Sequence, residues 1–154
     1  MNKIARILLS LSAVLTIVAP AAVSAQTANT VQIPSAQEYK TLLSRFADGQ
    51  KLTDAQFAQV YYGAAAQPGF NASRSFTAAK QAYDSGDTQK AYRLVADGLK
   101  DDPTNLWLLF KAYALAAAST DKAVKALAPK YQTRLLGICD AIFNSGKGVT
   151  EMTP

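Results

Sequence analysis

The sequence predicts an all-α fold built from antiparallel helix pairs. From residue 39 onward, apolar residues recur every three or four positions, which is the spacing of one buried helix face. Polar residues that cap helix N-termini stand before these stretches, and Gly or Pro stands after them. No long run of alternating β-branched residues indicates a strand. We therefore expect a single helical domain over residues 35–146.

The first two helices share one sequence signature. Ser35 with Glu38, and Thr53 with Gln56, each form a capping box, in which two side chains satisfy free backbone N–H groups. The buried stripes that follow are Tyr39, Leu42, Leu43 and Phe46 in the first helix, and Phe57, Val60, Tyr61 and Ala64 in the second. We expect the first helix to end at residues 48–49 and the second to end before residue 68.

The segment QPGFNASR, residues 67–74, is the longest irregular piece expected inside the domain. It carries an aromatic residue, Phe70, beside Asn71. An aromatic residue in a loop either contacts a binding partner or closes the end of a helix pair. The sequence leaves both interpretations open.

The block over residues 72–105 has the pattern of a tetratricopeptide-like helix pair. Such a repeat has small residues where two antiparallel helices touch, a Gly at the turn between them and a Pro about 34 residues after the start. The residues at these positions are Ala79, Ala82, Gly86, Ala91, Val95, Leu99 and Pro103. We expect helices over about 73–84 and 87–100. Scaffolds of this kind bind partners rather than catalyse reactions.

Three further stretches complete the expected domain. Thr104 or Asn105 caps a strongly apolar, central helix that contains Leu106, Trp107, Leu109, Phe110, Tyr113 and Leu115. It would be the first helix of a second repeat, whose partner starts near Asp121 and is interrupted at Pro129. A final helix over about 130–144 carries Leu135, Ile138, Cys139 and Ile142 and ends at Gly146, and we expect Cys139 to be buried there. Together these pairs would stack as a short tetratricopeptide-like α-solenoid.

The N-terminus has the features of a secretory signal peptide over residues 1–25. Lys3 and Arg6 precede an apolar run, and the triplet Val23-Ser24-Ala25 precedes the expected cleavage point. Residues 26–34 would be a mobile lead-in and 147–154 a C-terminal tail. We expect export to the periplasm or beyond, with no stable membrane insertion after cleavage. The net charge of +5 is spread along the chain, which does not support nucleic-acid binding.

The composition removes several kinds of active site. The chain has no His and one Cys, so imidazole metal sites and Ser-His or Cys-His catalysis are excluded. We expect no cofactor and no metal. The adjacent carboxylates Asp101 and Asp102 stand beside Pro103, where a solvated break between helices is expected instead of acid-base catalysis. The favoured function is a non-enzymatic scaffold; the alternative is a small metal-independent hydrolase or other enzyme that uses Asp, Tyr or Lys.

A partner-binding surface is expected on the concave face of the repeat, which its first helices form. On this alignment the residues that point inward are Thr77, Lys80, Tyr83, Phe110 and Lys111. Two lysines framed by aromatic rings could hold a peptide carboxylate or an acidic protein surface in the cell envelope. The alternative is a solvated lysine pair on an ordinary helix surface.

Nearly the whole mature chain resembles domain of unknown function 4919, a family of exported bacterial proteins. The resemblance rests on the stripe over residues 39–46, Leu52-Thr53, Tyr61-Tyr62-Gly63, Gln67 with Phe70-Asn71, and the turn Ser145-Gly146-Lys147-Gly148. It implies a helical fold and an export route, and nothing about a substrate. Two departures are Ala64-Ala65-Ala66, where the family has an aromatic residue, and the end at Pro154, before a short extended segment of the family. Either this protein lost that segment or the sequence is a fragment.

Overall fold

The computed structural model describes residues 31–71 and 74–145, and all regular structure in these ranges is helical. The α-helices are α1 (Ala36–Ala47), α2 (Asp54–Gly63), α3 (Thr77–Asp84), α4 (Thr88–Asp101), α5 (Leu106–Ala118), α6 (Lys122–Lys125) and α7 (Ala128–Ser145), and a 3-10 helix, η1 (Ala64–Ala66), extends α2. The all-α prediction is confirmed. The expected signal peptide and C-terminal tail lie outside the described residues.

The helix starts follow the caps that the sequence contains. Both capping boxes form, at Ser35 and at Thr53. Asn105, not Thr104, caps α5, because its side-chain oxygen accepts a hydrogen bond from the Leu108 N–H at 3.1 Å. Asp87 caps α4 in the same way, through a 3.0 Å bond from the Lys90 N–H. These bonds satisfy N–H groups that the first turn of a helix leaves without an internal partner.

Two helix boundaries differ from the sequence prediction. The third helix starts at Thr77 instead of near residue 73. Phe76, which precedes it, places its ring over Gly98 on α4, where a Cβ would lie 3.0 Å from the ring. The last helix starts at Ala128, so Pro129 lies within its first turn. A proline is tolerated there because the N–H that it lacks would have no helical partner.

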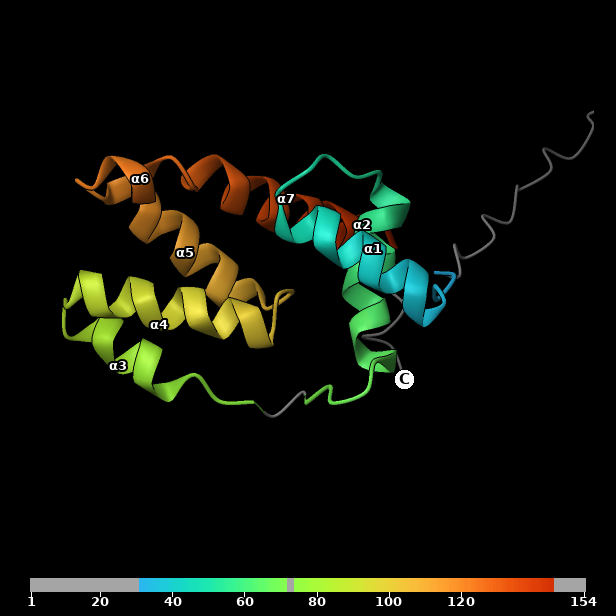
Figure 1. Ribbon diagram of the computed structural model, residues 1–154, viewed down its shortest axis with the longest axis horizontal. Coiled ribbons are helices and arrows are strands. Elements are labelled where there is room, and N and C mark those ends of the chain that lie inside the picture. The colour runs from blue at the N-terminus through green and yellow to red at the C-terminus, as the bar shows by residue number, and fades with distance from the viewer. Residues whose placement is uncertain (1–30, 72–73, 146–154) are drawn as a thin grey trace, which may run out of the picture.

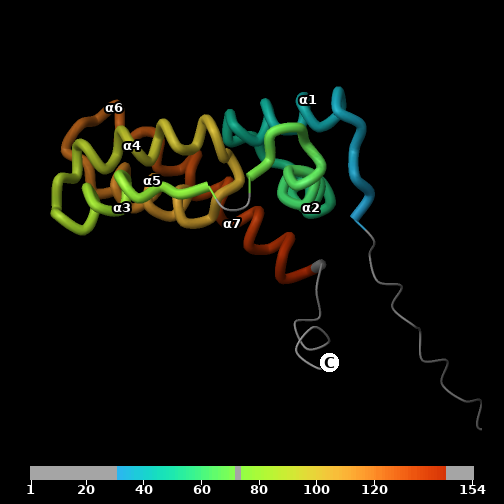
Figure 2. Tube along the Cα trace, turned by 90° about the horizontal axis from the view of Figure 1, so that it is seen from below, coloured from blue at the N-terminus to red at the C-terminus, as the bar shows by residue number. Residues whose placement is uncertain are grey.

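The helices form two groups that α7 connects. Helices α3 and α4 pack as a hairpin, α4 also packs on α5, and α1 packs on α2 (Figure 1). α7 contacts both α5 and α2, and its last turns extend away from α3 and α4 (Figure 2). The core runs through both groups, and its largest fully buried side chains are Phe46, Val60, Val95, Leu108, Leu109 and Ile138.

The buried face of α7 is not the one predicted from the sequence. Cys139 is exposed, so the expectation that it is buried is wrong. The face that packs on the rest of the molecule contains Tyr131, Arg134, Ile138 and Ala141. The charged residue Arg134 interrupts the apolar pattern of the face that is buried. The apolar residues alone therefore predict a buried face that is rotated by about one position from the observed one.

Candidate functional site

Three of the five predicted site residues form one cluster between α3 and α5. Tyr83 comes from the last turn of α3, and Phe110 and Lys111 come from the middle of α5. The Lys111 Nζ lies 3.6 Å from the centre of the Tyr83 ring and 5.2 Å from that of Phe110. A cation at these distances is attracted to the negative face of an aromatic ring. The ammonium group of Lys111 on α5 therefore bridges to the ring of Tyr83 on α3.

Trp107 is a fourth member that the sequence analysis did not select. Its ring centre lies 5.8 Å from the Lys111 Nζ. The signal was present in the sequence, because Trp107 precedes Lys111 by four positions and residues at that spacing share a helix face. We call Tyr83, Trp107, Phe110 and Lys111 the lysine cluster. Phe110 is 50% exposed, so the cluster reaches the surface.

The other two predicted residues make different contacts. The Lys80 Nζ lies 3.7 Å from an oxygen of Asp84, and both side chains are largely exposed. The Thr77 hydroxyl shares a 2.6 Å hydrogen bond with the hydroxyl of Ser75. Lys80 therefore already has a carboxylate partner. Within the described ranges the ion pairs of the chain involve Arg74, Lys80 and Lys100, and Lys111 takes part in none of them.

An apolar cleft adjoins the lysine cluster. It has a volume of about 360 Å³ and is lined by Tyr83, Thr88, Ala114, Leu115 and Ala118. Ala114 and Ala118 follow Lys111 by three and seven positions, so they continue its face of α5. The small alanine side chains leave the hollow open. The arrangement combines one fixed positive charge with an adjacent space for apolar side chains.

Of the residues that would support an enzyme, Tyr83 lines this cleft, whereas Lys80 and Asp84 do not. Lys80 and Asp84 pair on the outer surface, and Tyr83 lies under the ammonium group of Lys111. Among the described residues, no group of three His, Cys, Asp or Glu side chains is placed to hold a metal ion.

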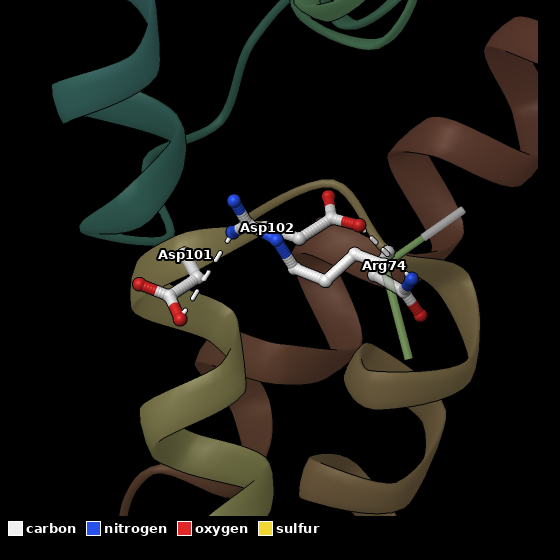
Figure 3. A network of polar contacts seen from close by, with 4 residues as sticks. Arg74, Asp101 and Asp102 are labelled. Atoms are coloured by element: carbon white, nitrogen blue, oxygen red, sulfur yellow. Dashed lines mark hydrogen bonds and ion pairs between the residues drawn. The ribbon is translucent and has the colours of Figure 1, made fainter. Parts of the chain in front are cut away.

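The long loop and the adjacent carboxylates lie together on another part of the surface. Phe70 is 48% exposed and lines a cleft, so about half of its surface is accessible to a ligand. Asp101 is exposed, as expected for a solvated break, and lies 3.9 Å from Arg74 (Figure 3). Asp102 is half-buried and accepts a 3.0 Å hydrogen bond from Asn105. The sequence did not predict that Arg74 joins this group.

Comparisons with known proteins assign no function to this chain. Within residues 31–71 and 74–145, no helix has the length and apolar character that crossing a membrane requires. Searches with the whole chain matched no family model, no curated protein and no solved structure. The resemblance to domain of unknown function 4919 therefore stays a prediction.

Proposed function

We propose that this chain is an exported, non-enzymatic helical scaffold that docks a peptide or protein partner in the bacterial envelope. The observation that carries the proposal is the lysine cluster with its adjoining apolar cleft. Lys111 is fixed by aromatic rings, has no carboxylate partner among the described residues, and stands at one end of a hollow that an apolar side chain can enter. Export rests on residues 1–25 of the sequence alone.

The scaffold would be a short tetratricopeptide-like solenoid in which α3 and α5 are the first helices of successive pairs. Three features support this assignment. Ala82 and Ala91 are buried, as required where paired helices approach closely, and Gly86 has a φ of 79° at the turn between α3 and α4. α4 packs on both α3 and α5. In such an arrangement the surface shared by α3 and α5 would be the concave, partner-binding one.

The partner should present an acidic group beside apolar side chains. A single exposed ion pair contributes only about 0.2–1 kcal/mol, so Lys111 cannot supply the affinity alone. Each apolar side chain that fills the cleft would add about 1.5–3 kcal/mol before the costs of ordering are counted. Lys111 would therefore select the register and charge of the partner, and the apolar cleft would supply most of the binding energy.

The test is a quantitative pull-down from envelope extract with the processed protein and single variants. We expect Lys111→Ala to reduce recovery of any partner that the wild type enriches. Lys111→Arg should retain part of it, because the positive charge remains. Lys40→Ala, an exposed lysine on α1, is the matched control and should change nothing. Equal recovery with Lys111→Ala and with Lys40→Ala would show that the lysine cluster is not the docking site.

A further inference from the structure

A second cleft lies where the two helix groups meet, away from the lysine cluster. Its volume is about 190 Å³. The walls come from α1, the loop after α2, the chain before α3 and the end of α4 with its turn to α5. The lining residues that matter here are Tyr39, Leu43, Phe70, Arg74, Asp101 and Asp102.

Arg74 brings unused hydrogen-bond donors to this cleft. Its side chain reaches from the segment before α3 toward the end of α4 (Figure 3). The Nη1 atom is 3.9 Å from the nearest oxygen of Asp101, which is too long for a hydrogen bond. The guanidinium makes no other polar contact with the described residues. Only 33% of this side chain is exposed, and it presents at the cleft a planar group that matches a carboxylate.

Asp102 brings a negative charge that forms no ion pair with the described residues. Its carboxylate accepts hydrogen bonds from the Asn105 amide at 3.0 Å and from the Thr104 hydroxyl at 3.4 Å, both neutral donors. A carboxylate has about four acceptor positions, so about two remain. Lys100, which also lines the cleft, is engaged 2.7 Å from Asp97. Burial and then the charge of Asp102 raise the pKa of Tyr39, which is consistent with this charge facing the cleft wall.

We propose that this cleft binds a free α-amino acid. The carboxylate of the ligand would lie on the guanidinium of Arg74, its ammonium group on Asp102, and its side chain against Phe70 and Leu43. A zwitterion supplies a carboxylate that can come within hydrogen-bond distance of Arg74 and a cation for Asp102 at once, and charge-assisted hydrogen bonds are the stronger kind. The volume also favours a small ligand, because pockets for drug-sized molecules measure about 300–1,000 Å³. None of these residues belongs to the lysine cluster, so the inference is independent of the proposed docking function.

Isothermal titration calorimetry of the full chain as purified from cells tests the proposal. The probes are L-phenylalanine, its methyl ester and its N-acetyl derivative. The ester lacks the negative charge of the amino acid and the acetyl derivative lacks the positive one. We expect saturable binding of the amino acid, and at least about tenfold weaker binding of each derivative. Equal binding of all three, or no binding of L-phenylalanine at about 10 mM, would overturn the proposal.

A variant tests the half of the site that would hold the carboxylate of the ligand. Arg74→Gln should weaken binding of L-phenylalanine at least about tenfold while binding of the methyl ester, which has no carboxylate, stays unchanged. Arg93→Gln, on the exposed side of α4, is the matched control and should bind all three probes as the wild type does. Thermal unfolding monitored by circular dichroism verifies that each variant is folded. If Arg74→Gln folds and binds L-phenylalanine with wild-type affinity, the assignment of Arg74 is wrong.

Discussion

Arg134 on α7 carries a buried positive charge that no carboxylate of the described residues neutralises. Only 4% of the residue is exposed, and its Nη2 donates a 2.8 Å hydrogen bond to the carbonyl of Pro103. The guanidinium also lies 4.8 Å from the centre of the Phe46 ring. Burial lowers the pKa of Arg134 to about 10. One side chain thus joins α7 to α1 and to the turn before α5, and the ring and the carbonyl offset part of the cost of desolvating its charge.

Tyr92 sets a testable dependence of stability on alkaline pH. Burial, followed by the hydrogen bond to Tyr131, raises the pKa of Tyr92 above its usual value of 10.0. Above pH 10 the unfolded chain therefore loses this proton while the folded chain keeps it, and stability falls as the pH rises. Arg134 acts in the opposite direction, because its folded pKa of about 10 lies below the usual 12.5. A variant is needed to separate the contributions of Tyr92 and Arg134 to the pH dependence of stability.

We expect Tyr92→Phe to lose less stability than the wild type between pH 8 and about pH 10.5. The difference should not exceed about 1 kcal/mol, because the side chain is partly solvated and water screens the shift. Urea denaturation at the two pH values measures it. The lost hydrogen bond to Tyr131 lowers stability at both pH values and cancels in the comparison. Parallel profiles for the two proteins would mean that Tyr92 does not control this range.

Cys139 should react in the folded protein. Its side chain is exposed on α7, so a polar reagent such as an aromatic disulfide can reach the sulfur without unfolding. We expect complete labelling in native buffer, measured as the absorbance of the coloured thiol that the reagent releases. The rate in denaturant should differ little from the native rate. Labelling that requires denaturant would instead indicate the buried position that the sequence pattern favoured.

At the scale of the elements, the α3–α4 hairpin depends on small side chains at its contact. Ala79, Ala82 and Ala91 are buried, and Ala91 is fully inaccessible to solvent. Gly98 is a second close approach, because a Cβ there would lie 3.0 Å from a methyl carbon of Leu108 on α5. The two contacts fix the separation between α4 and its neighbours.

Enlarging the side chain at position 91 should separate the paired helices. We expect Ala91→Leu to lower the free energy of unfolding by about 1–3 kcal/mol, since added methylene groups in a close-packed contact force shifts of the backbone. Ala78→Leu is the matched control, because Ala78 is exposed on α3, and its effect should stay within about 0.5 kcal/mol. Denaturant titration gives both values. Equal stability of the two variants would mean that Ala91 does not lie at the helix contact.

The elements show which parts of the fold the sequence can predict. Caps act through local hydrogen bonds, so the starts of α1, α2 and α4 follow directly from residues three positions apart. The face of α7 depends on distant contacts. The Cβ of any residue larger than glycine at position 137 would overlap the ring of Phe57 on α2, and nothing near position 137 in the sequence signals that ring. Hydrophobic periodicity likewise could not place Arg134 on the buried face, because the contacts that bury it come from distant parts of the sequence.

The candidate site was only partly predictable. Helical spacing places Tyr83, Phe110 and Lys111 on faces that could meet, and the structure brings them together. The sequence also contains the signal for the partner of Lys80, because Asp84 stands four positions later and opposite charges at that spacing pair on a helix surface. Arg74 and Asp102 approach one cleft from segments that are far apart in the sequence. Such convergence follows from tertiary packing and leaves no local pattern.

At the scale of the whole molecule, the arrangement leaves the lysine cluster on a surface that the long last helix does not cover. α7 packs on α5 and α2, whereas the lysine cluster is formed between α5 and α3 (Figure 1). The surface of α5 is thereby divided between the core and the candidate docking cleft. A partner in that cleft would contact α3, α4 and α5 without displacing α7.

Selection of a displayed random-peptide library on the immobilised protein tests whether the lysine cluster is a docking site, and it requires no known partner. We expect the enriched peptides to share an acidic residue beside apolar residues, and their binding to weaken as salt screens the charge. The Lys111→Glu variant, selected in parallel, should recover none of them. Recovery of the same peptides by Lys111→Glu, or enrichment of basic peptides by the wild type, would contradict the assignment of the lysine cluster as the docking site.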